Sequence, residues 1–160
     1  MTLIRDVAEA DLEAVLALNE ECVPHVNSIP LDEMRRFARE AAYFRVALAD
    51  GRLTAFLVGM TQDMAYESLN FRWFRARYPA FAYVDRIAVA RDARRLGLAS
   101  ALYDDFERHS AGLPLLACEV NLRPANEPSM RFHLARGFRQ IGSLAHEGGK
   151  KVAMLAKELG

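Results

Sequence analysis

A glycine-bearing segment near the middle of the chain carries the residue types best suited to chemistry. Residues 94–99 read Arg-Arg-Leu-Gly-Leu-Ala and follow the apolar, strand-like run Phe81–Val89. Leu98, Leu102 and Phe106 then recur at helical spacing. A strand, a tight turn and a helix start bring free backbone N–H groups and the positive end of the helix dipole to one point. We therefore expect this turn to bind a phosphate or pyrophosphate of a small molecule.

The charge around this turn agrees with an anionic ligand. Two acidic residues, Asp85 and Asp92, stand against seven arginines of the region: Arg72, Arg75, Arg77, Arg86, Arg91, Arg94 and Arg95. An ordinary solvated arginine surface would give the same pattern. The whole chain has a formal net charge of zero, which argues against a general nucleic-acid binder.

Composition and length predict one globular domain over residues 1–160. Of the 160 residues, 52% are hydrophobic and 26% charged, which is typical of a folded chain with its own core. The only cysteines, Cys22 and Cys118, are too few for a disulfide framework or a zinc site, so we expect no metal. The first residues lack the layout of a signal peptide and no apolar run could span a bilayer. We expect a cytoplasmic protein with no membrane partner.

The pattern of apolar residues and turn residues predicts the order of the remaining elements. Expected strands are Leu3–Arg5, Tyr43–Ala49, Leu53–Met60, Phe81–Val89, Pro114–Val120, Phe138–Ala145 and Lys151–Ala156. Expected helices start at Asp11, Pro30, near Phe71, after the glycine turn and at Asn126. Asp50-Gly51 and Gly148-Gly149 mark hairpin turns. This order predicts an α/β (α+β) fold with a mixed, mostly antiparallel twisted sheet flanked by helices on both faces.

Two separated motifs in this order resemble the GCN5-related N-acetyltransferase (GNAT) superfamily. The first is Arg94, Gly97 and Ala99, with the spacing of the family's Arg-two-residues-Gly-one-residue-Ala signature. The second is Asn126, then Phe132-His133, then Gly137-Phe138. The resemblance covers nearly the whole chain, and it implies acetyl-coenzyme A as cofactor and direct acetyl transfer to an amine.

The resemblance also implies where the cofactor would lie. The backbone of Ile87, Ala88 and Val89 would pair with the pantetheine arm. The pyrophosphate would bind to backbone N–H groups of the turn, and nearby positive charge and a hydroxyl group would assist. The residues concerned are Arg94, Arg95, Leu96, Gly97, Leu98, Ala99 and Ser100. Asn126 would hydrogen-bond the pantetheine. A helix cap is the alternative role for Asn126, and Asn121 competes for the contact.

Transfer to an amine poses two proton problems. An ammonium with a pKa of about 10.4 must lose a proton, and a thiolate of about 8.5 benefits from gaining one. Asp85 is the candidate base, with a plain ion pair to Arg86 as the alternative. His133 stands where relatives carry a tyrosine acid, and it is a candidate acid, a candidate base or a surface histidine. Tyr83 is a substitute acid.

The acceptor site is expected at the first two helices and the loop before Phe81. Glu21 and Glu67 are candidates to meet the amine, and Tyr66 and Trp73 are candidate pocket walls. The alternative is that the aromatic rings of this loop cover an open edge of the sheet. We expect a small-molecule amine as substrate. A protein or peptide N-acetyltransferase, or a non-catalytic acyl-CoA-binding sensor, remains the alternative, and the oligomeric state, a homodimer included, stays open.

Overall fold

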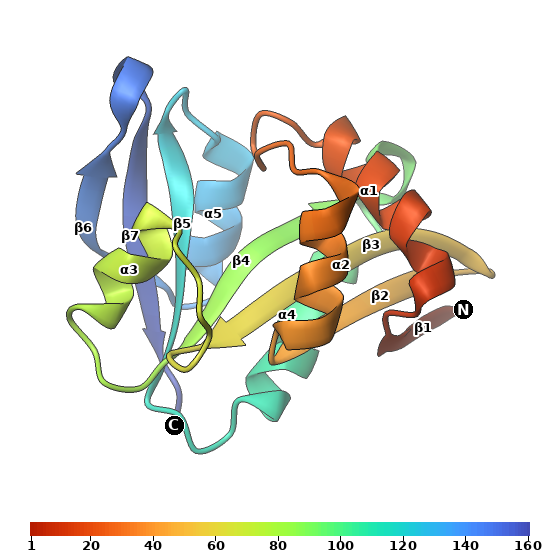
Figure 1. Cartoon of the computed structure of the whole chain (residues 1–160), viewed down its shortest axis with the longest axis horizontal. Helices are drawn as coiled ribbons and strands as arrows, with labels where there is room; N and C mark the ends of the chain where they lie inside the picture. Colours follow the sequence, from red (N-terminus) through yellow and green to blue (C-terminus); the bar gives the residue numbers. More distant parts are fainter.

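One sheet of seven strands runs through the molecule (Figure 1). In the computed structural model, which describes residues 1–160, the strands are β1 (Thr2–Asp6), β2 (Tyr43–Ala49), β3 (Arg52–Thr61), β4 (Ala82–Val89), β5 (Leu115–Arg123), β6 (Arg139–Ala145) and β7 (Lys151–Glu158). Their order is β1-β2-β3-β4-β5-β7-β6. Only β4 and β5 pair in parallel, and every other neighbouring pair is antiparallel.

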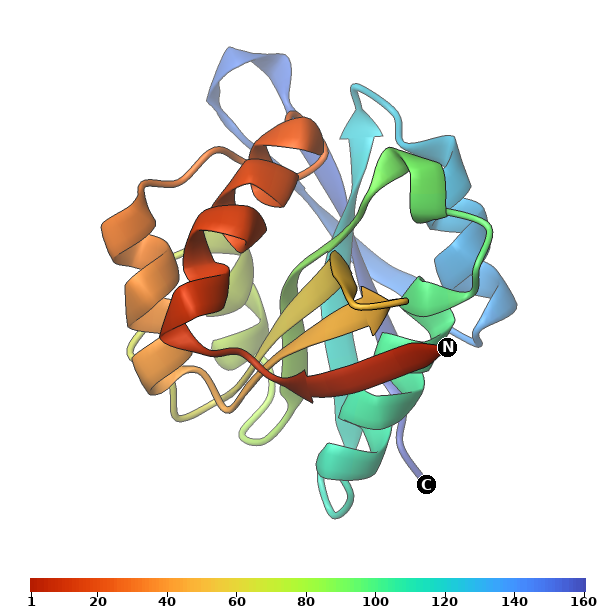
Figure 2. The same cartoon turned by 90° about the vertical axis from the view of Figure 1, so that its right-hand side faces the viewer.

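Five α-helices cover the two faces of this sheet. They are α1 (Leu12–Glu21), α2 (Leu31–Glu40), α3 (Leu69–Arg75), α4 (Leu98–His109) and α5 (Glu127–Ala135). Helices α1, α2 and α3 lie on one face, and α4 and α5 lie on the other (Figures 1 and 2). The prediction of a mixed, mostly antiparallel sheet with helices on both faces is confirmed. None of the helices combines the length and the apolar character that a membrane span needs.

Local sequence signals explain several of the element ends. Asp50 and Gly51 both have positive φ, 51° and 82°, as a tight hairpin turn between β2 and β3 requires. Asn126 caps α5, because its side-chain oxygen accepts the backbone N–H of Ser129. Gly137, with φ 96°, lets the chain leave the end of α5. The expected cap role of Asn126 is therefore present.

The strands β4 and β5 diverge soon after they meet. They pair only through Ala82 with Leu116 and Tyr83 with Ala117. Beyond those pairs β4 stays bound to β3 as far as Val89, and β5 stays bound to β7 (Figure 1). The facing edges of β4 and β5 are consequently free of strand partners toward their carboxyl ends.

A close approach between β3 and α4 fixes how the second face is packed. Gly59 lies in the buried middle of β3, and a Cβ atom added there would overlap the ring of Phe106. Phe106 is 2% exposed and belongs to a core cluster of 38 buried residues. Only glycine therefore lets α4 sit at this distance from the sheet.

We predict that Gly59→Ala destabilises the protein by about 1–3 kcal/mol, because overpacking forces the Phe106 ring or the helix to move. Denaturant unfolding measures the change. Phe106→Leu in the same chain should restore part of the loss, because it removes the overlapping atoms. If the two substitutions simply add, this contact is not the cause.

Candidate active site

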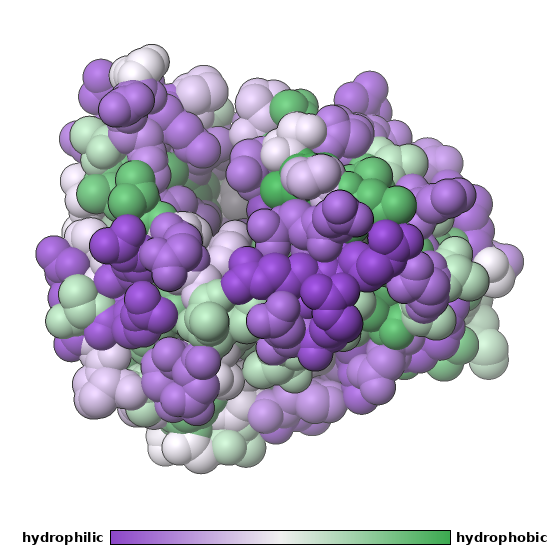
Figure 3. All heavy atoms as spheres, viewed as in Figure 1, coloured by the Kyte–Doolittle hydropathy of each residue, from purple (hydrophilic) through white to green (hydrophobic).

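A cleft of about 1030 Å³ opens where β4 and β5 diverge. Its mouth is visible as a recess between the side of the molecule formed by α3 and the β6–β7 hairpin and the side formed by α1 and α2 (Figure 3). The α4 start, β4 and α5 line one half, which we call the turn half. The α1–α2 loop, α2, the loop before α3 and the β6–β7 hairpin line the other, which we call the outer half.

The start of α4 presents a cluster of free donors to the turn half. Gly97, at φ 74°, is the residue before the helix, and its conformation turns the chain from the Arg91–Ala93 3₁₀ turn into α4. The backbone N–H groups of Gly97, Leu98, Ala99 and Ser100 donate no hydrogen bond within the protein. All four residues line the cleft. Together with the helix dipole, these donors fit an anionic group such as a phosphate.

The arginines of this region divide into separate roles. Arg94 lines the cleft beside the free N–H groups, and its Nε donates to the Val89 carbonyl at 3.3 Å. Arg95 and Leu96 are exposed and do not line the cleft. Arg77 instead lies 3.8 Å from the Trp73 ring centre. The seven arginines thus do not form one patch around the turn.

The free edge of β4 borders the same half of the cleft. Ile87, Ala88 and Val89 pair with β3 on one side and line the cleft on the other. An extended chain could hydrogen-bond to this edge as an added strand does. Asn126 and Asn121 also line this half, so both expected competitors for a ligand contact are present there.

Glu119 lies in the middle of the cleft, on β5, and the sequence analysis did not select it. The Tyr83 hydroxyl donates to its Oε2 at 2.7 Å. Burial raises the pKa of Glu119 to about 7, and the nearby charge of Asp85 acts in the same direction. The hydrogen bond from Tyr83 opposes that shift. A carboxyl group with this pKa is suited to accept a proton near neutral pH.

Asp85 also lines the cleft, but both of its oxygens are occupied. The Tyr66 hydroxyl donates to Oδ1 at 2.7 Å, and Arg86 Nε donates to Oδ2 at 2.9 Å. The Asp85 side chain is 4% exposed. The ion pair with Arg86, which was the alternative reading of Asp85, is therefore what the structure contains.

Arg86 connects this ion pair to the α1–α2 loop. Its guanidinium donates to the Asn19 side chain on α1 and to both the backbone and side-chain oxygens of Asn27. The β3–β4 register shifts between Val58 and Gly59, so that Asp85 has no partner opposite it on β3. Such a bulge re-aims the side chains around it, and here it accompanies the buried pair.

Tyr83 lies behind Glu119 rather than on the cleft wall. Its side chain is fully buried, and burial raises its pKa well above the ordinary value for tyrosine. Its hydroxyl proton is directed at Glu119. In this structure the Tyr83 hydroxyl fixes the position of the Glu119 carboxylate through this hydrogen bond.

His133 is buried on α5 and hydrogen-bonded through both ring nitrogens. Nδ1 lies 2.7 Å from the Ser129 carbonyl oxygen, which can only accept, so Nδ1 carries the proton. Nε2 lies 2.6 Å from the Tyr103 hydroxyl and accepts from it. Burial lowers the pKa of His133, so that the ring is neutral at pH 7. Tyr103 also lines the cleft. The sequence analysis did not select it, because its place in the apolar stripe of α4 is typical of a core residue.

The four expected acceptor residues take different positions. Tyr66 and Glu67 line the outer half of the cleft. Glu21 does not line it, and its carboxylate accepts the backbone N–H of Arg91 at 3.3 Å. Trp73 packs over Gly142 of β6, where a Cβ atom would overlap its ring, so it covers the sheet as the alternative reading expected. Further polar residues that the sequence analysis did not select also line the outer half, and they include Arg36, Asn70, His146 and Lys150.

The comparisons with known proteins define the family. The sequence model of the acetyltransferase (GNAT) family matches residues 12–138, so the chain belongs to this family, as the two motifs predicted. No curated protein sequence matches the chain. No group of three or more His, Cys, Asp and Glu side chains is placed to hold a metal ion.

Solved structures share the fold at low sequence identity. The ribosomal-protein-S18-alanine N-acetyltransferase from Escherichia coli has a TM-score of 0.77 at 17% identity, over 99% of this chain and 94% of that one. Ard1 from Thermoplasma volcanium has a TM-score of 0.81 at 20% identity, over 99% and 97%. NAA60 from Arabidopsis thaliana, solved with a bisubstrate analogue, has a TM-score of 0.77 at 19% identity, over 99% of this chain and 98% of that one.

The free N–H groups at the start of α4 lead to a direct test. Gly97→Glu should weaken coenzyme A binding by about 100-fold or more, because it adds a like charge at the anion site. Gly97→Asn is the matched control, since asparagine tolerates positive φ and adds no charge. Isothermal calorimetry measures affinity, and thermal unfolding checks that both variants fold. A folded Glu variant with wild-type affinity would move the phosphate site elsewhere.

Proposed function

We propose that this chain, as one domain over residues 1–160, is an acetyl-CoA-dependent N-acetyltransferase. It transfers the acetyl group directly to the amine of a small molecule. The observation that carries the proposal is the presence, in one cleft, of Glu119 with a pKa of about 7 and of the free N–H cluster at the start of α4. The first group suits proton removal from an amine, and the second suits a pyrophosphate.

The turn half of the cleft fits the cofactor. Gly97, Leu98, Ala99 and Ser100 would hold the pyrophosphate through their N–H groups, and Arg94 would add positive charge. The open edge of Ile87–Val89 would pair with the pantetheine amides. When bound, acetyl-CoA supplies an acetyl group activated as a thioester.

Glu119 is the residue we assign as base. An ammonium with a pKa of about 10.4 is almost fully protonated at neutral pH, so attack requires prior loss of a proton. The Glu119 carboxylate accepts that proton at the oxygen left free by Tyr83, whose hydroxyl holds Oε2. Asp85 keeps Arg86 and Tyr66 in place instead, because both of its oxygens are engaged.

Tyr103 is the donor we assign to the departing sulfur. The neutral His133 ring cannot act as a histidinium acid, and its Nε2 accepts from Tyr103. His133 therefore positions the Tyr103 hydroxyl, which lines the cleft. This hydroxyl has a single proton, which it gives to Nε2 here, so it turns from Nε2 toward the sulfur as negative charge develops on the leaving group. Burial raises the pKa of Tyr103 well above its usual value, so a hydrogen bond to the thiolate is favoured over complete proton transfer.

Direct attack on the thioester agrees with the state of the two cysteines. Burial raises the pKa of Cys118, which keeps that thiol protonated and poorly nucleophilic. Cys22 is buried and has only long contacts, 3.9 Å from Sγ to the Val89 carbonyl and to Arg94. Neither cysteine is hydrogen-bonded to a histidine or carboxylate that could activate it.

A thiol-release assay with acetyl-CoA separates this proposal from its alternatives. Turnover with free amines supports a small-molecule acetyltransferase. Turnover restricted to peptides would indicate a protein or peptide N-acetyltransferase. Coenzyme A binding without turnover on any acceptor would indicate a sensor module.

The base assignment predicts a change in the shape of the pH profile. In the wild type, kcat/KM should rise through about pH 7 as Glu119 loses its proton and then level off. In Glu119→Gln only amine that is already neutral can react, so the rate should keep rising by about tenfold per pH unit. At pH 7.5 the variant should be about 100-fold or more slower.

Glu67→Gln is the matched control, since Glu67 lies in the same cleft with its side chain 87% exposed. Its kcat/KM should still rise through about pH 7 and then level off. The assay uses an acceptor amine with a pKa near 10, so that the amine itself does not titrate in the pH range in which Glu119 does. If kcat/KM of Glu119→Gln also levels off above about pH 7, another group is the base.

The donor assignment predicts that Tyr103→Phe lowers kcat by about 100-fold while coenzyme A affinity is unchanged. His133→Leu should lower kcat less, because it leaves the hydroxyl in place but unoriented. The double variant should be no slower than Tyr103→Phe alone, since both residues act through one hydroxyl. Wild-type turnover in Tyr103→Phe would remove Tyr103 from the mechanism.

A further inference from the structure

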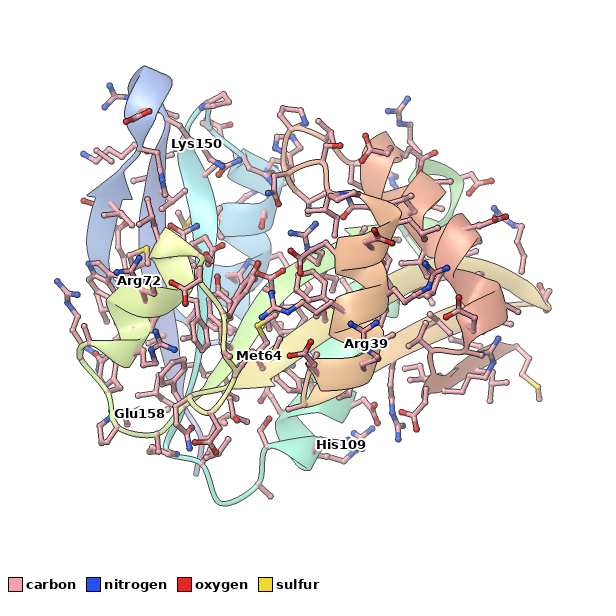
Figure 4. The ribbon with its side chains drawn as sticks, in the orientation of Figure 1. Arg39, Met64, Arg72, His109, Lys150 and Glu158 are labelled. Carbon is pink, nitrogen blue, oxygen red and sulfur yellow. The ribbon has the colours of Figure 1, made fainter.

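Lys150 is a cation in the outer half of the cleft that has no acidic partner. It is the residue before β7, it is half-buried, and it lines the cleft. No carboxylate lies within 4.0 Å of its Nζ, and its side chain makes no hydrogen bond. Figure 4 shows Lys150 at the end of the β6–β7 hairpin, beside the upper end of β5.

The other half-buried cation of the outer half, on α2, is neutralised by its own helix. Arg36 pairs with Glu33 at 3.2 Å and with Glu40 at 3.3 Å, and it also donates to the Ala65 carbonyl. Lys150 therefore differs from Arg36 in leaving its positive charge available to a bound molecule. A half-buried ammonium without a counterion favours an anion close to it.

Lys150 is also close enough to the proposed base to affect it. Its charge lowers the pKa of both Glu119 and His146. His146 Nε2 lies 2.8 Å from the Asn70 side-chain oxygen, and Asn70 lines the same cleft as Glu119. One wall of the cleft thus leads from the acid Glu119 through neutral groups to the cation Lys150.

An apolar surface accompanies this polar wall. Leu69, at the start of α3, is 58% exposed and lines the cleft. Val26, in the α1–α2 loop, lines it as well. A large exposed leucine in a ligand cleft favours an apolar part of the ligand.

We propose that the acceptor is an amine that also carries a carboxylate, with an α-amino acid bearing an apolar side chain as the simplest form. Glu119 receives the amine, Lys150 receives the carboxylate, and Leu69 and Val26 contact the side chain. This inference rests on the proposed function, because it concerns the acceptor of that same reaction.

The experiment compares acceptors that differ only in the carboxylate. Leucine is measured against 3-methylbutylamine, and phenylalanine against 2-phenylethylamine, by thiol release from acetyl-CoA. The wild type should prefer each amino acid by about tenfold or more in kcat/KM. Lys150→Ala should reduce that ratio to near one, Lys150→Glu should reverse it, and Lys150→Arg should preserve it.

Lys151→Ala is the matched control, because Lys151 is the neighbouring lysine and does not line the cleft. It should keep the wild-type ratio. Calorimetry with coenzyme A and thermal unfolding confirm that each variant binds cofactor and folds. Lys150→Gln replaces the alanine variant if that one is unstable.

The outcomes separate the inference from the proposed function. Equal turnover of both members of each pair, or an unchanged ratio in Lys150→Ala, overturns the inference and leaves the acetyltransferase proposal intact. Better turnover of peptides with an acidic second residue than of every free amino acid also overturns it. Cofactor binding without turnover on any amine overturns the proposed function and this inference with it.

Discussion

The divergence of β4 and β5 after two residue pairs is the constraint on which the site depends. Buried backbone N–H and C=O groups need partners, so an open edge inside a sheet is stable only where water or a ligand reaches it. Antiparallel pairing with β3 and β7 holds the two strands in place on their outer sides. The same divergence creates the cleft, exposes the edge of Ile87–Val89 and lets Glu119 face into the opening.

Two acidic residues in this cleft lie in opposite electrostatic environments. Asp85 forms an ion pair with Arg86, which ties β4 to the α1–α2 loop through Asn27. Glu119 has no cationic partner within 4.0 Å, and burial together with the negative charge of Asp85 raises its pKa to about 7. Asp85 thus contributes to the base chemistry through its charge on Glu119 rather than by taking a proton itself.

The parts of the site that depend on local sequence were predictable, and those that depend on strand pairing were not. Gly97 and the helix after it follow from a turn residue and an apolar stripe, and the structure contains both. Asp85 was selected through the family resemblance, but the bulge and the Arg86 pair depend on register with β3. Glu119 had one local signal, a carboxylate inside the apolar run Leu115–Val120, and its orientation toward the cleft depends on the β5–β7 pairing.

The charges left unpaired in the cleft complement a molecule with two charged groups. Glu119 lacks a cationic partner, Lys150 lacks an acidic one, and neutral Asn70 and His146 lie between them. Had the two been in contact, they would form an ion pair, the pKa of Glu119 would fall, and proton acceptance near pH 7 would be lost. Their separation keeps both available, so the distance between base and cation serves the chemistry and the selection of the acceptor together.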